Sequence, residues 1–381
     1  MAALKTTYLA LGSNLENRAY FLQKAIFMLH ERAGSIQKIS PVYEAPAWGF
    51  ESDPFLNCCL SLETSLSPQD LLEVVLRIES ELGRERRDIS GYQSRTIDID
   101  ILYYNNLIMD SEALKVPHPQ LEQRRFVLKP LADIAPQWYH PVLKKDTRNL
   151  LQECKDHSVL TKTGIRLYRD LQELFTALNF VAIEGNIGAG KTSLAHKIAE
   201  DFSAKLVLER FADNPFLPKF YEDQARYAFP LEMSFMADRY QQFTEDTSQF
   251  DLFKNFMVSD YDVYKSLIFA KITLQPDEYL LYRKVFNFMY QEVKKPRLYV
   301  YLYQTTERLL DNIKKRGRSY EQQIAPEYLE KINRGYFDFI KSYPEQQNLI
   351  LDVSDLDFVN SKADYEFLLD QLVRFTVALP V

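Results

Sequence analysis

The alternation of apolar and polar positions predicts both strands and helices in the first half of the chain. Apolar runs or period-two alternation predict strands, and apolar residues at three- and four-residue spacing predict amphipathic helices. The expected strands lie at 6–11, 35–43, 58–64 and 95–104, and the expected helices at 18–33 and 67–82. Pro68 in the first turn and Gly83 after the last turn are typical of helix ends. The pattern favours a mixed α/β unit.

The second half has the same mixed pattern, arranged around one buried strand. Val181, Ala182 and Ile183 form an apolar run that enters a glycine-rich turn, and a helix is expected to follow. The other expected strands lie at 205–209, 256–260, 297–302 and 349–353, and the expected helices at 165–178, 193–202, 226–239 and 326–343. No low-complexity linker separates the halves, so we expect two domains that are packed or stiffly joined.

Composition and charge narrow the class of protein. With 381 residues, 46% of them hydrophobic, the chain is long enough for two globular domains. Its net charge of −7 gives no broad basic surface, and we expect no nucleic-acid partner. Cys58, Cys59 and Cys154 have neither metal-ligand nor disulfide spacing, so a cytoplasmic location is expected. The N-terminus lacks a signal peptide and no apolar run approaches about 18 residues, so we expect neither secretion nor a membrane span.

The glycine-rich turn fits a phosphate-binding loop. Residues 185–192 match G-x-x-x-x-G-K-[ST] at every fixed position. Backbone N–H groups that curl around phosphates leave no room for several Cβ atoms, and the following helix directs its positive end at the same anion. We expect Lys191 to reach the outer phosphates of ATP and the Thr192 hydroxyl to bind one magnesium ion. The predicted ATP-binding residues are Gly185, Gly188, Gly190, Lys191, Thr192 and Ser193.

Two aspartates predict a second magnesium site. Residues two apart in a strand face the same side, so Asp98 and Asp100 present adjacent carboxylates, and hard oxygen ligands favour magnesium. The alternative is an exposed strand face with two solvated carboxylates. Nearby cationic residues favour the metal site, since they would supply donors to a triphosphate. These residues are Arg84, Arg95, His118, Arg124 and Arg125.

Residues 5–155 carry short motifs in a characteristic order. They are Gly12-Ser13-Asn14, Pro46 with Trp48, Phe55-Leu56-Asn57, Gly83-Arg84, Arg95 to Asp100, Val116-Pro117-His118 and Arg124-Arg125-Phe126. This order resembles hydroxymethyldihydropterin pyrophosphokinase, an enzyme of folate biosynthesis. The resemblance implies a ferredoxin-like α+β fold. It also implies transfer of a pyrophosphoryl group from ATP to the hydroxymethyl oxygen of 6-hydroxymethyl-7,8-dihydropterin, with release of AMP.

The same resemblance implies roles for the motif residues. Asp98 and Asp100 would hold two magnesium ions. The implied catalytic residues, which would contact the phosphates, are Arg84, Arg95, His118 and Arg124. The implied pterin-binding residues are Pro46, Trp48, Phe55, Asn57 and Phe126, with Asn57 bonding the pterin edge and the aromatic rings bracketing its plane.

A second series of motifs runs through residues 179–381. It comprises the phosphate loop, Glu209, Tyr221, Arg226, Arg239, Arg316-Gly317-Arg318 and Leu351-Asp352-Val353. This order resembles the deoxynucleoside kinases. It implies a P-loop kinase fold with a parallel sheet flanked by helices, and a homodimer through this domain.

The kinase resemblance also implies site residues. Glu209 would accept the 5′-hydroxyl proton of the deoxynucleoside, and Arg316 and Arg318 would join Lys191 at the transferred phosphoryl group. The implied deoxynucleoside-binding residues are Glu209, Tyr221, Arg226, Glu232 and Arg239. Where many relatives have an acid-Arg-Ser triplet, this chain has Asp260-Tyr261-Asp262. The arginine is missing, and Asp260 becomes a candidate for magnesium binding or for service as a second base.

Glu232 favours a purine substrate. Relatives often have Gln there, whereas an ionised Glu only accepts hydrogen bonds. The N1–H and exocyclic amine of guanine are adjacent donors that a carboxylate matches, so we expect deoxyguanosine first. Deoxyadenosine would come second, because a salt bridge between Glu232 and Arg239 would still accommodate adenine.

The sequence thus predicts a bifunctional enzyme that uses magnesium and ATP in both halves. The predicted domains are a pterin pyrophosphokinase at 1–157, a helical linker at 158–178 and a deoxynucleoside kinase at 179–381. Two alternatives stay open. One half has lost its activity and serves as a scaffold, or the protein is a nucleotide sensor whose sites bind without transfer.

Overall fold

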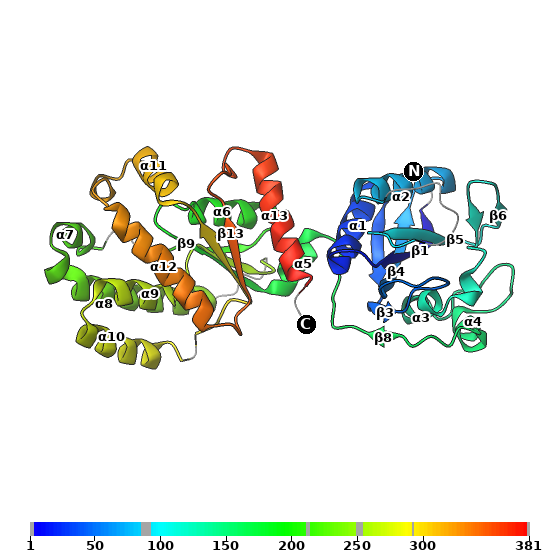
Figure 1. The fold of residues 1–381 in the computed structure, drawn as a ribbon, viewed down its shortest axis with the longest axis horizontal. Helices are drawn as coiled ribbons and strands as arrows, with labels where there is room; N and C mark the ends of the chain where they lie inside the picture. Colours follow the sequence, from blue (N-terminus) through cyan, green and yellow to red (C-terminus); the bar gives the residue numbers. More distant parts are fainter. Residues whose placement is uncertain (1–3, 85–92, 211–213, 249–253, 292, 379–381) are drawn as a thin grey trace. The chain divides into compact units, whose positions relative to one another are not determined.

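The computed structural model describes residues 4–84, 93–210, 214–248, 254–291 and 293–378. They form two compact units, one containing the chain up to Leu174 and from Val373 onward, the other Phe175–Leu372 (Figure 1). Among these residues, no helix has the length and apolar character needed to cross a bilayer.

The N-terminal unit is built on an antiparallel sheet. Its strands are β1 (Lys5–Ser13), β2 (Ser35–Ile39), β3 (Tyr43–Ala45), β4 (Phe55–Thr64), β5 (Asp98–Tyr104) and β8 (Thr161–Lys162). They run in the order β5-β1-β4-β3-β8, with β2 also paired to β4. The path β1-α1-β2-β4-α2-β5, with β5-β1-β4-β2 as spatial order, is the ferredoxin-like arrangement that the sequence predicts.

Helices pack on both faces of this sheet. α1 (Arg18–Arg32) and α2 (Pro68–Glu81) contact each other and the sheet on one side, and α3 (Arg125–Ile134) packs against Tyr8, Ala10 and Cys59 on the other (Figure 1). The smaller elements are β6 (Met109–Asp110), β7 (Lys115–Val116), the 3₁₀ turn η1 (Leu121–Gln123) and α4 (Thr147–Glu153).

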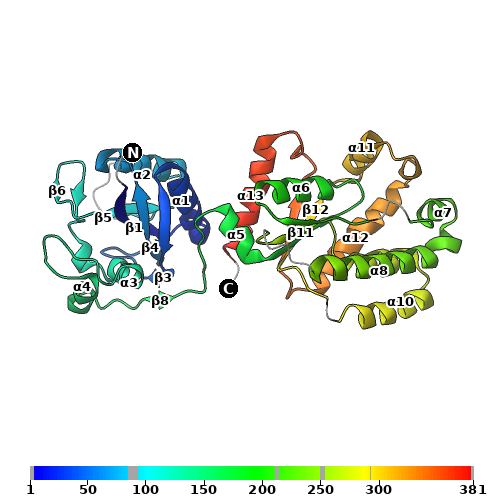
Figure 2. The ribbon, with the colours of Figure 1, turned by 180° about the vertical axis from the view of Figure 1, so that it is seen from behind.

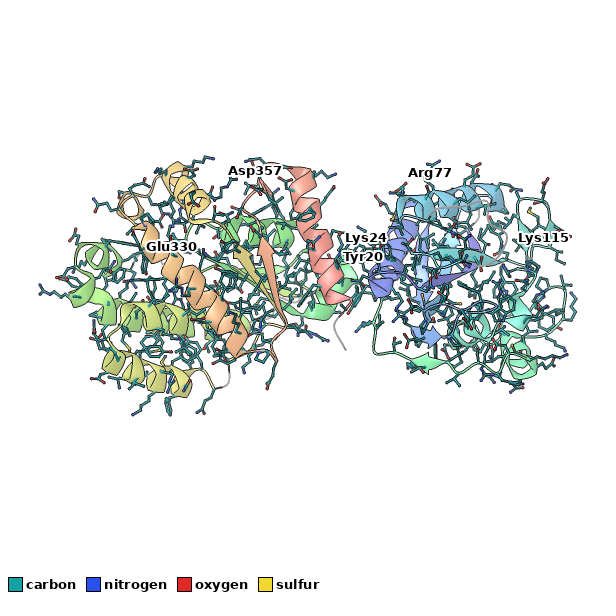
Figure 3. All side chains as sticks on the ribbon, viewed as in Figure 1. Tyr20, Lys24, Arg77, Lys115, Glu330 and Asp357 are labelled. Atoms are coloured by element: carbon teal, nitrogen blue, oxygen red, sulfur yellow. The ribbon has the colours of Figure 1, made fainter. Side chains whose placement is uncertain are left out.

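α2 shows how the sequence pattern produces an element. Ser67 and Asp70 form a reciprocal capping box before Pro68, as expected for a helix start. Val75 and Ile78 are buried toward the sheet, whereas Arg77 extends outward into solvent (Figure 3). The capped start fixes the position of the helix, and its apolar stripe fixes the face that it buries.

The C-terminal unit is built on a parallel sheet. Its strands are β9 (Phe180–Gly185), β10 (Lys205–Val207), β11 (Met257–Ser259), β12 (Leu298–Tyr303) and β13 (Asn348–Asp352), in the order β10-β11-β9-β12-β13. Strands added after β9 lie first on one side of it and then on the other. The loop that follows β9 therefore opens at the switch point of the sheet, where ligands bind in such folds.

Helices flank this sheet as predicted. They are α5 (Leu171–Leu178), α6 (Lys191–Asp201), α7 (Leu217–Glu222), α8 (Gln224–Ser248), α9 (Lys265–Thr273), α10 (Pro276–Met289), α11 (Thr306–Arg316), the 3₁₀ turn η2 (Ser319–Glu321), α12 (Pro326–Ser342) and α13 (Lys362–Thr376). Side chains of α8, α9 and α12 form one large core with one face of the sheet, and α6 packs on β9 and β11 (Figure 2).

Two predicted elements differ from the structure. The helix expected over 165–178 begins only at Leu171, because the Asp170 carboxylate accepts the Glu173 N–H (2.7 Å) and fixes the cap there. Part of the preceding segment, Thr161–Lys162, instead pairs with β3. The strand expected over 35–43 is split into β2 and β3, since Pro41 lacks the N–H that a continuous ladder needs.

Candidate active sites

The first candidate site is a pocket of about 190 Å³ at one end of the antiparallel sheet. The register of the strands brings its residues together, because Gly12 on β1 pairs with Asn57 on β4 and with Asp98 on β5. The predicted site residues that line the pocket are Pro46, Trp48, Phe55, Asn57, Arg84, Arg95, Asp98, Asp100, Arg124 and Phe126. Residues far apart in the sequence therefore meet around one cavity.

Three arginines contact the aspartate pair. Asp98 Oδ1 accepts Arg84 Nη1 at 2.6 Å and Arg95 Nη1 at 3.0 Å, and Asp100 Oδ2 accepts Arg124 Nη1 at 3.1 Å. Three guanidinium groups and two carboxylates thus lie close together in one half-buried pocket. A polyphosphate would find several guanidinium donors already directed at the same point.

The chemistry of the carboxylates suits a divalent cation. Burial and the neighbouring charge of Asp98 raise the pKa of Asp100 to about 6. A hard cation between the two oxygens would relieve that repulsion. Among the described residues, no group of three or more acidic, His or Cys side chains is assembled for a metal.

His118 stands behind this pair and does not line the pocket. Its Nε2 lies 3.8 Å from Asp100 Oδ2. Burial and the nearby Arg124 charge lower the pKa of His118 to about 4, so the imidazole is neutral near pH 7. A neutral imidazole can donate one hydrogen bond and accept another.

The aromatic residues surround the other part of the pocket. The rings of Trp48 and Phe126 have centroids 6.5 Å apart and are tilted by 54°. The Arg124 guanidinium carbon lies 5.1 Å from the Trp48 centroid, so this arginine links the aromatic and anionic parts. Asn57 is buried, and its amide faces the lining beside Phe55. A flat heterocycle with polar edges fits such a lining.

Glu79 and Asn14 organise this site, and sequence reasoning missed both roles. The buried Glu79 carboxylate bonds Arg84 and accepts the Ile99 N–H (2.8 Å) between the two aspartates. Asn14 accepts the Arg95 N–H (2.7 Å). A charged residue on the buried stripe of α2 was the available signal for Glu79.

The second candidate site begins at the phosphate loop. Gly188 and Gly190 have φ of +84° and +88°, in the region that favours glycine. A Cβ at Gly190 would lie 2.7 Å from the Phe358 ring. Both the positive φ and the lack of space therefore require glycine at this position. Lys191 Nζ donates to the Asn186 carbonyl at 2.9 Å, and burial, with the charge of Lys265, lowers the pKa of Lys191 to about 8.

A cavity of about 540 Å³ lies beside this loop. Its lining contains Gly188, Gly190, Lys191, Thr192 and Ser193 of the predicted ATP-binding set, and Gly185 supports the loop from the end of β9. Side chains of α11 and the segment after β13, which includes Asp357 (Figure 3), complete it. The size and the helix N-terminus suit a nucleoside triphosphate.

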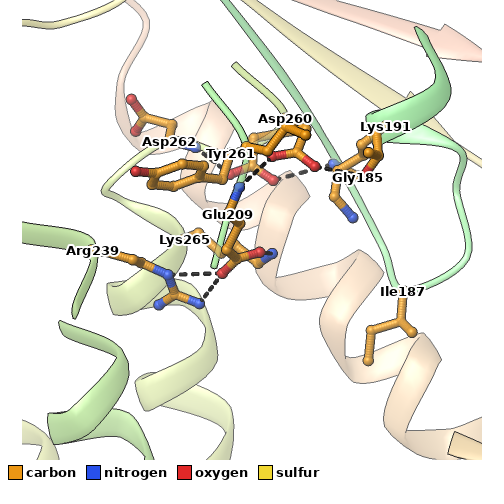
Figure 4. A network of polar contacts seen from close by, with 12 residues as sticks. Gly185, Ile187, Lys191, Glu209, Arg239, Asp260, Tyr261, Asp262 and Lys265 are labelled. Atoms are coloured by element: carbon orange, nitrogen blue, oxygen red, sulfur yellow. Dashed lines mark hydrogen bonds and ion pairs between the residues drawn. The ribbon is translucent and has the colours of Figure 1, made fainter. Parts of the chain in front are cut away.

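Asp260 connects this loop with the neighbouring strand (Figure 4). One carboxylate oxygen lies 2.5 Å from the Thr192 hydroxyl, and the other accepts the Glu209 N–H at 2.8 Å. A hydroxyl beside a carboxylate is a donor set that magnesium accepts.

Glu209 is held by two cations (Figure 4). Its Oε1 accepts Arg239 Nε and Nη2 at 2.9 and 2.6 Å, and its Oε2 lies 2.5 Å from Lys265 Nζ. Burial alone would raise the pKa of Glu209, but the charges of Lys265 and Arg239 outweigh it and hold that pKa well below its usual range. The carboxylate is therefore ionised and fixed in orientation.

A smaller cavity of about 130 Å³ surrounds Glu209. Tyr221, Glu232, Arg239, Arg316 and Arg318 all line it. The buried Glu321 pairs with both Arg316 and Arg318, and Arg318 Nη1 lies 3.3 Å from Glu321 Oε1. The arginines thus face the cavity in a fixed position, which the sequence could not show.

Arg226 does not reach this cavity. It is exposed, and its guanidinium stacks 5.3 Å from the Tyr227 centroid. Helical spacing explains the difference, since Glu232 and Arg239 are seven residues apart and share a face of α8, whereas Arg226 is six residues from Glu232. The prediction that Arg226 binds the deoxynucleoside is therefore not supported by its position.

Arg239 also differs from expectation. The predicted salt bridge to Glu232 is replaced by the bond to Glu209, and Arg239 Nη1 bonds the Ser266 hydroxyl at 2.8 Å. In this arrangement the charges of Lys265 and Arg239 lower the pKa of Glu209, whereas burial raises the pKa of Glu232 to about 7.

Comparison with known proteins shows to which families the two halves of the chain belong. The deoxynucleoside kinase family matches residues 181–377, and the 7,8-dihydro-6-hydroxymethylpterin-pyrophosphokinase family matches residues 8–136. A deoxyguanosine kinase of Bacillus subtilis is 40% identical over 49% of this chain and 92% of its own length. A 2-amino-4-hydroxy-6-hydroxymethyldihydropteridine pyrophosphokinase of Aquifex aeolicus is 45% identical over 39% of this chain and 92% of its own length. The chain belongs to both families.

A solved deoxyadenosine kinase of M. mycoides with bound dATP is 25% identical, with a TM-score of 0.45, over 51% of this chain and 98% of that one. The two family matches, one in each half of the chain, show a fusion of a pterin pyrophosphokinase with a deoxynucleoside kinase.

Lys265 is the residue of the deoxynucleoside kinase half that the sequence did not reveal. The segment Asp260-Tyr261-Asp262 lacks the arginine found in many relatives, and Lys265, three residues further, places a cation 2.5 Å from Glu209. A lysine at the first residue of α9, three residues after Asp262, was the available signal.

Proposed function

We propose that the N-terminal half transfers a pyrophosphoryl group from ATP to the hydroxymethyl oxygen of 6-hydroxymethyl-7,8-dihydropterin, releasing AMP. The observation that carries this proposal is the joining of an aromatic cavity to the Asp98–Asp100 pair and its arginines. Asn57, Trp48 and Phe126 would orient the pterin plane so that its hydroxymethyl group points toward the carboxylates.

The charged residues of this half would position the triphosphate. Arg84, Arg95 and Arg124 would leave the carboxylates and bind phosphate oxygens, with neutral His118 as a further hydrogen-bond partner. Asp98 and Asp100 would hold two magnesium ions, which neutralise developing negative charge on the phosphates. The protein itself contributes placement and charge, since phosphoryl transfer needs little covalent chemistry from side chains.

We propose that the C-terminal half phosphorylates the 5′-hydroxyl of a deoxynucleoside. The ionised Glu209 supports this proposal, because it lines the smaller cavity of this unit, which shares Lys191, Thr192 and the two arginines Arg316 and Arg318 with the larger cavity beside the phosphate loop. It would accept the hydroxyl proton, Tyr221 would bind the sugar, and Lys191, Arg316 and Arg318 would contact the transferred group. Thr192 and Asp260 would hold one magnesium ion, which would supply positive charge against the phosphates.

The base would be a purine, with deoxyguanosine preferred and deoxyadenosine second. Glu232 lines the acceptor cavity with a carboxyl oxygen that has no hydrogen-bond partner among the described residues. The similar Bacillus subtilis protein is named a deoxyguanosine kinase, which favours the same base.

Product analysis of the whole chain tests both activities. MgATP with hydroxymethyldihydropterin should yield AMP, and MgATP with deoxyguanosine should yield ADP. Asp98→Ala should abolish only AMP formation, and Lys191→Ala only ADP formation. One silent half in the unaltered chain would favour the scaffold alternative, and nucleotide binding without either product would favour a sensor.

Location and assembly complete the proposal. Cys58, Cys59 and Cys154 are free and buried, which suits a reducing cytoplasm. We place the activities in residues 1–157 and 179–381, and the kinase half in a homodimer. Exposed apolar side chains on α10, Leu281 at 53% and Phe288 at 81%, would be covered by such an interface.

A further inference from the structure

Glu232 places a buried carboxyl group in the lining of the proposed deoxynucleoside cavity. It lies on α8, only 2% exposed, and its Oε2 has no hydrogen-bond partner among the described residues. A buried carboxyl oxygen without a partner costs free energy unless a ligand supplies one. Because Glu232 lines the acceptor cavity, that ligand would be the base of the deoxynucleoside.

The other oxygen of Glu232 contacts the Thr273 hydroxyl, which has two possible acceptors but only one hydrogen. Thr273 Oγ1 lies 3.0 Å from Glu232 Oε1 and 2.9 Å from the Phe269 carbonyl one helical turn earlier. A hydroxyl has one hydrogen, and a carbonyl can only accept. If Thr273 donates to Phe269, as hydroxyls in helices commonly do, the contact with Glu232 requires a hydrogen on the carboxyl group. With an ionised Glu232, the hydroxyl would have to abandon one acceptor.

The charges around Glu232 do not force ionisation. On α8, Arg239 is bonded to Glu209 and Ser266, and on α9, Lys265 is bonded to Glu209. Glu209 itself is negative. Two phenols also lie close to Glu232, Tyr282 on α10 and Tyr328 on α12. Tyr221 on α7 and the group formed by Arg316, Arg318 and Glu321 line the same cavity, and Glu321 pairs with both of these arginines. Burial therefore dominates and raises the pKa of Glu232 to about 7.

We propose that Glu232 selects the purine base through its own protonation state. As a carboxylate it accepts from the N1–H and the exocyclic amine of guanine. As a neutral acid it donates to N1 of adenine and accepts from the adenine amine. Guanine binding to the neutral site thus releases one proton to solvent, whereas adenine binding retains it, and the Thr273 hydroxyl turns between Phe269 and Glu232 to match. The inference rests on the proposed kinase activity.

The test is the ratio of kcat/KM for deoxyguanosine to that for deoxyadenosine, measured on the whole chain with saturating MgATP from about pH 5.5 to 8.5. Effects of pH on ATP binding and on phosphoryl transfer are common to both substrates and cancel. The ratio should rise by more than roughly tenfold between about pH 6 and pH 8, since one proton separates the two modes. Calorimetry near pH 6.5 should also show proton release on binding of deoxyguanosine only.

Two variants separate selection from structural support. Glu232→Gln carries a fixed donor and a fixed acceptor, so its ratio should be independent of pH and should favour deoxyadenosine. Thr273→Val removes a hydroxyl that can donate to the carboxylate or accept from the neutral acid, and the ratio should stay dependent on pH because the proton on Glu232 itself sets it. A flat ratio in the unaltered chain, with both purines phosphorylated, overturns the inference while the kinase activity stands. No phosphorylation of either purine would instead refute the proposed activity on which it rests.

Discussion

Lys265→Met probes the charge balance at Glu209. The Lys265–Glu209 pair is 2.5 Å long, with side chains 10% and 9% exposed. Removing one partner of a buried pair costs about 3–5 kcal/mol, because the remaining charge is left in a poorly solvated place. Arg239 stays bonded to Glu209, so we expect the lower end, about 3 kcal/mol less stability for this unit.

The pH dependence gives the sharper result. Glu209 has a lowered pKa in the folded state, so its contribution to stability is present above its unfolded pKa and lost only as the pH falls through the folded value. Loss of Lys265 raises the folded pKa and moves that loss to higher pH. The unaltered kinase should keep Glu209 ionised down to about pH 5, whereas the variant should lose activity progressively below neutrality.

The assay measures deoxynucleoside phosphorylation and urea unfolding from about pH 5 to 8, with AMP formation by the other half as an internal reference. At about pH 5 the kinase kcat of the variant should be about a hundredfold below that of the unaltered chain, within the range that a proton acceptor contributes. Lys265→Arg should recover most activity. Lys271→Met, on an exposed position of the same helix, is the matched control. A Lys265→Met variant with unchanged rate and unchanged pH profile would refute the role assigned to this lysine.

Three further predictions concern other parts of the molecule. Glu79→Gln should lower AMP formation about tenfold at unchanged ADP formation, because Arg84 and the Ile99 N–H lose a charged acceptor worth about 1.5–3 kcal/mol. Gly190→Ala should abolish ADP formation and destabilise the unit by about 2 kcal/mol or more, since its Cβ would meet the Phe358 ring at a positive φ; urea unfolding and ATP binding measure this. Phe288→Asp should convert the proposed dimer to a monomer in sedimentation, with the fold retained.

Controls isolate each cause. Glu81→Gln alters an exposed carboxylate on the same helix as Glu79 and should leave AMP formation intact. Gly317→Ala has a similar positive φ but no neighbour within 4 Å, so it should show the backbone cost without the clash. Lys284→Asp changes charge on α10 without removing an apolar side chain and should leave assembly unchanged. Dimers that persist in Phe288→Asp would exclude α10 from the interface, and a monomeric unaltered chain would exclude the dimer itself.

Local patterns predicted the elements and motifs well. The alternation of Asp98, Ile99 and Asp100 correctly predicted a strand, and the strand–loop–helix context of Gly190 and Lys191 matches β9 and α6. These features depend on residues close together in the chain, where spacing alone determines which side chains share a face.

Long-range pairing was not predictable in the same way. The bonds of Lys265 to Glu209 and of Glu79 to Ile99 join residues 56 and 20 positions apart, and neither has a local signature. Arg226 was predicted to bind the deoxynucleoside from its position in a motif, but its side chain is exposed. A motif position does not determine which face of a long helix a side chain occupies. The helix start at Leu171 was missed because one capping carboxylate, Asp170, outweighed the apolar spacing before it.

The two contacts of Asp260 have a consequence for the order in which substrates influence each other. One carboxylate contacts Thr192, which is proposed to bind the nucleotide, and the N–H of Glu209, which is proposed to bind the acceptor. A displacement of Asp260 caused by one substrate therefore alters the site of the other. Thermodynamic reciprocity then requires that ATP change the dissociation constant of the deoxynucleoside by the same factor as the deoxynucleoside changes that of ATP.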